Sequence, residues 1–217
     1  MIKYLIPSIV IGGALTEVMR RVTLLLIRNR AGETQNRLIA GKFSAVFWIL
    51  AGAALCGLTA VLIPNPIVLS ISIMCMMLVL ISLSVIDADI RKIPNSLLIA
   101  LLVIKAAAIF AGGDMNGFTV AFWGFGLGAG LLLVSLFLPL GFGMGDLKLI
   151  AVMGFCLGII GLLQAVAIMG IVMGIYTIIL LITRKGGLKT KAALGPPLSL
   201  GMAITLLLPM TDIILKK

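Results

Sequence analysis

Three of the seven acidic residues in this 217-residue chain lie in two short motifs beside long apolar runs. Residues 87–95 read Asp-Ala-Asp-Ile-Arg-Lys-Ile-Pro-Asn, and residues 143–148 read Gly-Met-Gly-Asp-Leu-Lys. A carboxylate at the edge of a bilayer is costly to keep there, so it is a functional candidate by default. Two such carboxylates on one side of a membrane can supply the general base and the general acid of a peptidase.

That chemistry requires Asp87 and Asp146 to meet. Like charges a few ångströms apart resist ionising together, so the pair is expected to share one proton near the working pH and to titrate as a unit. The ionised carboxylate then takes a proton from water, while the protonated one polarises the carbonyl group of the peptide bond. These residues therefore predict an intramembrane aspartyl protease.

Other hydrolytic centres find little support in the sequence. The chain has no histidine, and its three cysteines, Cys56, Cys75 and Cys156, lie inside apolar runs without a CxxC pair. This pattern argues against a zinc site and against a disulfide framework. We expect no metal, no cofactor for proteolysis, and cysteines that act as small buried hydrophobic residues.

The first motif is expected to form a short turn over residues 88–95. Asp87 and Asp89 are two positions apart and would face different sides of a helix, so only one easily addresses a common partner. Ile93 precedes Pro94, which favours an extended backbone, and Asn95 offers an N-cap for the next span. Alone, this motif fits a charged surface hairpin equally well.

The second motif carries more local information. Gly143 and Gly145 permit close backbone approach, and Asp146 would stand at the start of the following helix, where the helix dipole favours a carboxylate. Lys148 is poorly placed to pair with Asp146 along that helix and is expected to meet lipid headgroups. Without the first motif, a simple helix cap would explain Asp146.

Composition places both motifs in a membrane protein. The chain is 62% hydrophobic and 11% charged, whereas soluble domains are roughly half apolar and about a quarter charged. A single soluble core cannot bury this excess, because the surface must still face water. The net charge of +10 is spread over short clusters rather than one patch, so we expect a lipid environment and no nucleic-acid partner.

We predict one domain over residues 1–217, an all-α polytopic bundle of about eight transmembrane helices. A helix needs about 20 apolar residues to cross a bilayer. The predicted spans are residues 4–19, 43–63, 67–86, 96–112, 117–140, 147–160, 162–183 and 194–210. The run 147–183 is too long for one span, and the segment from Gly158 to Gly161 is the expected place for a turn.

The distribution of basic residues predicts the orientation, because cytoplasmic loops are enriched in Lys and Arg. Thirteen of the 17 basic residues fall in alternate loops. They are Arg20, Arg21, Arg28, Arg30, Arg37, Lys42, Arg91, Lys92, Lys148, Arg184, Lys185, Lys189 and Lys191. Both termini would then be non-cytoplasmic, and the active site would lie at the cytoplasmic edge of the cell membrane. We expect the first span to be retained, since Pro7 interrupts it and no signal-peptidase site follows.

The motifs resemble those of the type IV prepilin peptidases, which are membrane aspartyl proteases of the GxGD type. Residues 86–95 are similar to the first catalytic block of that family, and residues 143–149 are similar to the second. Leu194-Gly195-Pro196-Pro197-Leu198 resembles the Gly-Pro turn that opens the last span of the family. The resemblance covers roughly residues 43–210.

This resemblance implies that Asp87 and Asp146 form the catalytic pair, with Asp89 as a neighbour. The supporting motif residues would be Pro94, Asn95, Gly143, Gly145 and Lys148. The substrate would be a prepilin or pseudopilin precursor whose short basic leader is cut at the cytoplasmic end of an apolar helix.

The chain also departs from the family pattern. Many bacterial members carry two CxxC pairs between the first two spans, whereas the loop at residues 20–42 has no cysteine. Many also N-methylate the new N-terminus with S-adenosylmethionine, a cofactor required here only if methylation is retained. Glu17 stands where those enzymes usually have asparagine and is expected to pair with Arg20 or Arg21.

Two other classes fit less well. Presenilin-like and signal-peptide-peptidase-like GxGD proteases have a Tyr-Asp block and a Pro-Ala-Leu block, whereas this chain has Ile86-Asp87 and a Gly-Pro-Pro turn. A proton or cation transporter would place its carboxylates within broken helices and show repeat symmetry, and the sequence shows neither. Lys105 is expected to extend toward the outer surface, and the glycines at 124–130 to pack between spans.

Overall fold

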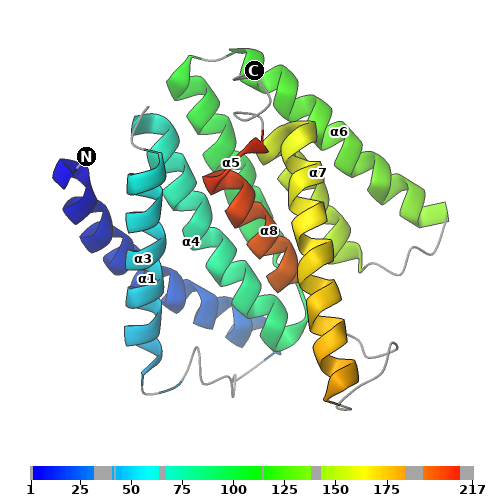
Figure 1. The fold of residues 1–217 in the computed structure, drawn as a ribbon, viewed down its shortest axis with the longest axis horizontal. Helices are drawn as coiled ribbons and strands as arrows, with labels where there is room; N and C mark the ends of the chain where they lie inside the picture. The colour runs from blue at the N-terminus through cyan, green and yellow to red at the C-terminus, as the bar shows by residue number, and fades with distance from the viewer. Residues whose placement is uncertain are drawn as a thin grey trace.

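A computed structural model describes residues 2–31, 41, 43–63, 67–113, 115–137, 143–183 and 193–210. Within these ranges all regular secondary structure is helical (Figure 1). The helices are α1 (Ile2–Ala31), α3 (Ser44–Leu62), α4 (Ile67–Ile90), α5 (Asn95–Gly112), α6 (Met115–Phe137), α7 (Met144–Ile182) and α8 (Gly195–Leu207). Five of them, α3 to α7, are long and apolar enough to cross a membrane. The predicted membrane helix bundle is confirmed, with fewer candidate spans than the eight expected.

The difference in number arises partly in α7, which contains both predicted spans of the run 147–183. Gly158 interrupts this helix with φ 73° and ψ −178°, and the two parts of α7 run in different directions (Figure 1). A positive φ of this size is readily available only to glycine. The predicted turn therefore exists, and it is made at Gly158.

The first helix is longer than predicted. α1 continues past residue 19 to Ala31 and takes up part of the expected loop at residues 20–42. The Thr16 and Thr23 hydroxyls donate to carbonyls of the preceding turn, and Glu17 pairs with the following arginines, so these polar side chains find partners along the helix itself. α1 is not among the helices that meet the length and composition of a membrane span.

The predicted turn at residues 88–95 is also shorter than expected. α4 extends to Ile90, so Asp87 and Asp89 lie in its last turn. Arg91 ends the helix with φ 51°, and its N–H donates to the Asp87 carbonyl at 2.9 Å. α5 begins at Asn95 after Pro94, without a side-chain cap, so the expected Asn95 N-cap is wrong.

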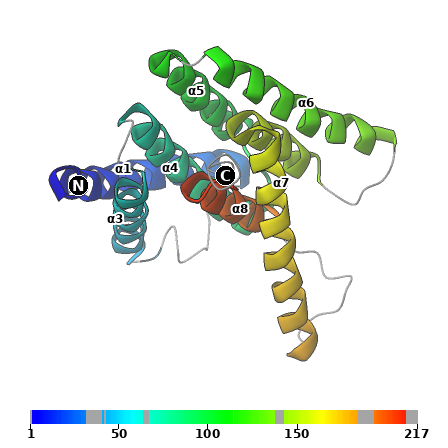
Figure 2. The ribbon, with the colours of Figure 1, turned by 45° about the horizontal axis from the view of Figure 1, so that its top comes forward.

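α8 occupies a central position between α4 and α7 (Figures 1 and 2). Leu198 and Met202 on this short helix are fully buried in the core. A Cβ atom at Gly201 would overlap the Ala165 carbonyl oxygen, so α8 and α7 pack backbone to backbone. The side chain of Gln164 then binds the Leu208 carbonyl and the Met210 N–H, at 2.8 and 2.9 Å, beyond the end of α8.

α6 packs against α7 at one edge of the bundle (Figure 2). A Cβ atom on Gly124 or Gly128 would overlap the backbone of α7, which confirms the expected close packing at these two glycines. Gly126 and Gly130 face open space instead. Several residues that predict the orientation lie outside the described residues: Arg37, Lys42, Arg184, Lys185, Lys189 and Lys191.

Candidate active site

A cavity of about 350 Å³ lies where the C-terminal ends of α1 and α4 meet the N-terminal ends of α5 and α7. Asp87 and Asp146 both line it. The other lining residues described are Arg30, Arg91, Lys92, Ile93, Asn95, Gly143, Met144, Gly145 and Lys148. The structure thus brings the two predicted aspartates to one cavity from motifs that are far apart in the sequence.

Asp87 is the more enclosed of the two aspartates. Its side chain lies in the last turn of α4 and is only 4% exposed. One carboxylate oxygen, Oδ2, accepts a hydrogen bond of 2.8 Å from the Gly195 N–H. A buried carboxylate needs such donors, because it has given up its hydration shell.

Gly195 is a site residue whose contact the sequence did not predict. It opens α8, and a Cβ atom there would lie 2.5 Å from Oδ2 of Asp87 and 2.6 Å from its Cβ. Two prolines, Pro196 and Pro197, occupy the first helical turn, where the missing N–H groups cost little. The Gly-Pro-Pro turn could be recognised in the sequence. Its contact with Asp87, 108 residues earlier in the chain, could not.

Asp146 lies in the first turn of α7, as predicted. Its Oδ2 accepts a longer bond, 3.3 Å, from the N–H of Gly143 at the start of the helix. A Cβ atom on Gly145 would contact the Ile93 side chain at 3.4 Å, so this glycine lets the second motif approach the segment before Pro94. The two motifs therefore pack directly on each other.

The two carboxylates line the same cavity, with Asp87 buried and Asp146 half-buried. Charges at a partly buried site interact more strongly than charges at a fully exposed surface. Side chains in this relation can share one proton, which is the arrangement that acid–base hydrolysis requires.

The remaining predicted residues divide between the cavity and its surroundings. Asn95 and Lys148 line the cavity, so Lys148 faces the same space as Asp146. Pro94 is buried at the start of α5. Asp89 is half-buried and is not among the described residues that line the cavity, as expected for a residue two positions from Asp87.

Four cations surround the aspartates: Arg30, Arg91, Lys92 and Lys148. Sequence reasoning did not connect Arg30 with the site, because the first span was expected to end near residue 19. The longer α1 carries Ile27 into the core and places Arg30 at the cavity. Within the described residues, no three His, Cys, Asp or Glu side chains gather in a way that could hold a metal ion.

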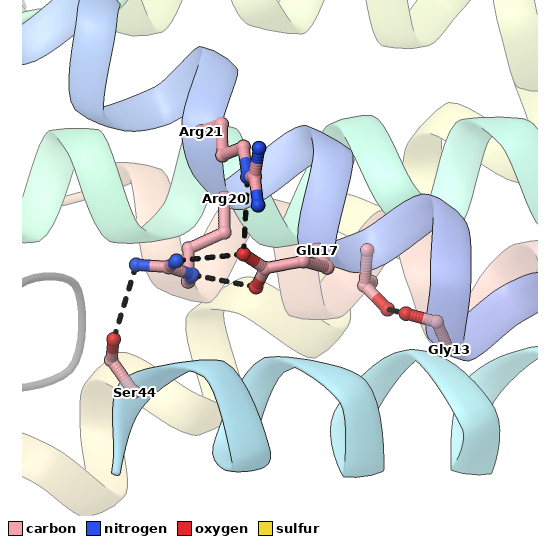
Figure 3. A network of polar contacts seen from close by, with 6 residues as sticks. Gly13, Glu17, Arg20, Arg21 and Ser44 are labelled. Carbon is pink, nitrogen blue, oxygen red and sulfur yellow. Dashed lines mark hydrogen bonds and ion pairs between the residues drawn. The ribbon is translucent and has the colours of Figure 1, made fainter. Parts of the chain in front are cut away.

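Glu17 belongs to a separate network that joins α1 to α3 (Figure 3). Nε and Nη2 of Arg20 each donate to Glu17 at 2.7 Å, and Nε of Arg21 donates at 3.3 Å. Nη1 of Arg20 also donates to Ser44 Oγ at 3.3 Å. The predicted pairing is confirmed with both arginines, and both carboxylate oxygens of Glu17 are used in it.

Comparison with known families adds an independent finding. The model of the type IV leader peptidase family matches residues 74–178, a segment that contains both acidic motifs. It runs from the middle of α4 to the second part of α7. Neither a curated protein nor a solved structure matches the chain.

Proposed function

We propose that the chain is a membrane peptidase that cleaves leaders from prepilin-like precursors by an aspartyl mechanism, as the match of residues 74–178 to the type IV leader peptidase family model supports. The observation that carries the mechanism is the shared cavity of Asp87 and Asp146, at the end of α4 and the start of α7. The whole chain has no histidine, so no histidine-based catalytic group competes with this pair.

In the proposed reaction, one ionised aspartate takes a proton from a water molecule, and the water oxygen bonds to the carbonyl carbon of the scissile peptide. The protonated aspartate gives its proton to the carbonyl oxygen. Collapse of this tetrahedral species breaks the C–N bond, and the leaving nitrogen receives a proton from the dyad. The products are a leader with a new carboxylate and a mature protein with a new amine.

The proposed substrate has a short basic segment followed by an apolar helix. The basic segment would remain in the cytoplasm by the same charge rule that predicts the orientation of the enzyme. The scissile bond would then lie at the depth of Asp87 and Asp146, at the cytoplasmic surface of the cell membrane. A prepilin or pseudopilin precursor has this arrangement.

Proteolysis of this kind uses no cofactor. We keep N-methylation with S-adenosylmethionine outside the proposal, because Glu17 stands where methylating relatives usually carry asparagine and is held by Arg20 and Arg21. The Glu17 carboxylate binds Arg20 and Arg21, which lie on the same helix, and Glu17 does not line the cavity that holds Asp87 and Asp146.

The proposal is tested with Asp87→Asn and Asp146→Asn, assayed on a prepilin-like peptide in detergent or vesicles. Each variant should lose roughly 10²–10⁴-fold in cleavage rate, because one amide cannot exchange the proton that the pair must move. Helical circular dichroism and membrane extraction of both variants should match the unaltered protein. Substantial turnover by either variant would refute the assignment.

A further inference from the structure

α1 is longer than α3, the helix against which its first part packs. Nη1 of Arg20 donates to Oγ of Ser44, the first residue of α3, at 3.3 Å. α1 then continues to Ala31, so its C-terminal segment (residues 21–31) extends about 16 Å beyond this contact. In Figure 1 this segment runs from α3 toward the lower end of α4.

The C-terminal segment of α1 begins and ends at the same end of the bundle. It begins beside Ser44, where α3 starts. Near its other end, Arg30 lines the cavity of the two aspartates, which stand at the end of α4 and the start of α7. α3, α4 and α7 are long and apolar enough to cross a membrane, so these helix ends mark the level of its surface. A helical segment that joins them lies along the surface instead of across the bilayer.

The two sides of this segment differ in their surroundings. Thr23 and Ile27, one turn apart, face the bundle and are fully buried. Val22 and Leu25 lie on the outward side, where 37% and 59% of their surfaces are exposed. Residues three positions apart are neighbours on a helix face, so the outward side carries an exposed apolar face.

Two arginines lie beside this apolar face. Arg21 and Arg28 are seven positions apart, which is about two helical turns, so they project from the same side of α1 with Leu25 between them. Both are exposed, and 74% of the Arg21 side chain is accessible although its Nε donates to Glu17 at 3.3 Å. A guanidinium has five N–H donors, so Arg21 keeps donors for a further partner. Exposed apolar residues flanked by arginines are typical of helices that lie in a membrane interface.

We propose that the C-terminal segment of α1 is a binding surface for anionic phospholipids. Arg21 and Arg28 bind the lipid phosphates, while the exposed apolar face lies against the acyl chains. Arginine matches phosphate in charge and in hydrogen-bond geometry. Negatively charged membrane surfaces attract basic amphipathic helices, whereas neutral lipids offer the same acyl chains without a net charge. The arginines therefore select an anionic headgroup, and the apolar face selects a lipid over a soluble anion.

The test uses the full chain in vesicles that contain equal amounts of two photoreactive lipids. One is a phosphatidylglycerol and the other a phosphatidylcholine, and both carry the same reactive acyl chain. Mass spectrometry then maps the residues that each lipid labels. The phosphatidylglycerol should label Val22 and Leu25 about tenfold more than the phosphatidylcholine does. At Phe122 and Trp123, which are exposed on the apolar helix α6, the two lipids should label equally and so calibrate the ratio.

Two double variants separate charge from shape. Arg21→Gln/Arg28→Gln should bring the labelling ratio at Val22 and Leu25 close to the ratio on α6, whereas Arg21→Lys/Arg28→Lys should keep most of the preference. High salt should lower the ratio in the unaltered protein, because salt screens exposed charges. Unchanged labelling of α6 in all three proteins shows that the variants are folded and inserted.

Three outcomes would overturn the inference. They are equal labelling of Val22 and Leu25 by both lipids in the unaltered protein, no labelling there by either lipid, and a ratio that Arg21→Gln/Arg28→Gln leaves unchanged. None of these measurements uses a peptide substrate. Failure of the protein to cut a prepilin-like peptide would therefore overturn the proposed function and leave the lipid-binding surface standing.

Discussion

At the scale of single residues, the surroundings of the three motif aspartates decide what each can do. Asp87 is buried against the Gly195 N–H, and Asp146 accepts a longer bond from Gly143 at the same cavity. Asp89 shares a helix turn with Asp87 but does not line that cavity. Side chains two positions apart on a helix point in different directions. Asp89 carries the same carboxylate as Asp87, but its direction keeps it out of the dyad.

Asp89→Asn should therefore retain activity. We expect less than a tenfold loss in kcat/KM on a prepilin-like peptide, in contrast to the near-complete loss in Asp87→Asn. The neutral amide has nearly the same shape as the carboxylate, so the comparison isolates the charge. A dead Asp89→Asn together with an active Asp87→Asn would exchange the roles of the two residues.

Gly195→Ala should impair the dyad without touching either carboxylate chemically. The added methyl would lie 2.5 Å from Oδ2 of Asp87, so the carboxylate, the α8 turn or both must move. Misplacement of a catalytic group by about 1 Å costs on the order of 10²-fold in rate, and we expect this loss in kcat with little change in KM. Gly126→Ala adds the same methyl where nothing lies within 4 Å and should leave the kinetics unaltered. Equal kinetics for the two variants would contradict the assigned role of Gly195.

At the scale of helices, hydropathy predicted where most elements lie but not how their ends form. The spans at residues 43–63 and 96–112 correspond closely to α3 and α5, because each is an apolar run bounded by polar or turn-forming residues. α4 continues beyond its predicted end because Asp87 is buried by α8, which hydropathy along a single segment does not detect. α1 continues to Ala31 with Glu17 paired to Arg20 and Arg21 along the helix and with Ile27 packed into the core beyond them.

The break in α7 was predictable because it depends on glycine, and it supports a stability prediction. Gly158→Ala would force a side chain into φ 73° and place its Cβ 2.6 Å from Val120 Cγ1. We expect a loss of about 1–3 kcal/mol in the free energy of unfolding, measured by thermal or denaturant unfolding in detergent. Gly170→Ala, on the same helix in open space, should be neutral or slightly stabilising. If both variants unfold alike, Gly158 does not require its glycine.

At the scale of the whole molecule, the site is assembled from four distant parts of the chain. Sequence motifs identified the aspartates because carboxylates are rare in apolar surroundings. They did not show that Arg30 and Gly195 lie beside these aspartates, because these contacts depend on how α1 and α8 pack against α4. Local patterns report which residues can perform chemistry, whereas long-range packing determines which of them meet.

The position of the cavity at the helix ends leads to a prediction about the substrate. Asp87 is in the last turn of α4 and Asp146 in the first turn of α7, so only a bond near one membrane surface can reach both. Four apolar residues inserted between the basic segment and the scissile bond would move that bond about 6 Å into the bilayer if they are helical. The basic segment is expected not to follow, because moving its charges into the bilayer is costly. Leader release, measured by mass spectrometry in vesicles, should fall at least tenfold.

The matched control carries the same four residues on the other side of the basic segment. This substrate has equal length and hydrophobicity, but its scissile bond keeps its distance from the charges and should be cut at the original rate. The cut in both substrates should lie on the side of the membrane that carries the basic segment. Undiminished cleavage of the first substrate, or cleavage at the opposite surface, would show that the depth of Asp87 and Asp146 does not select the bond.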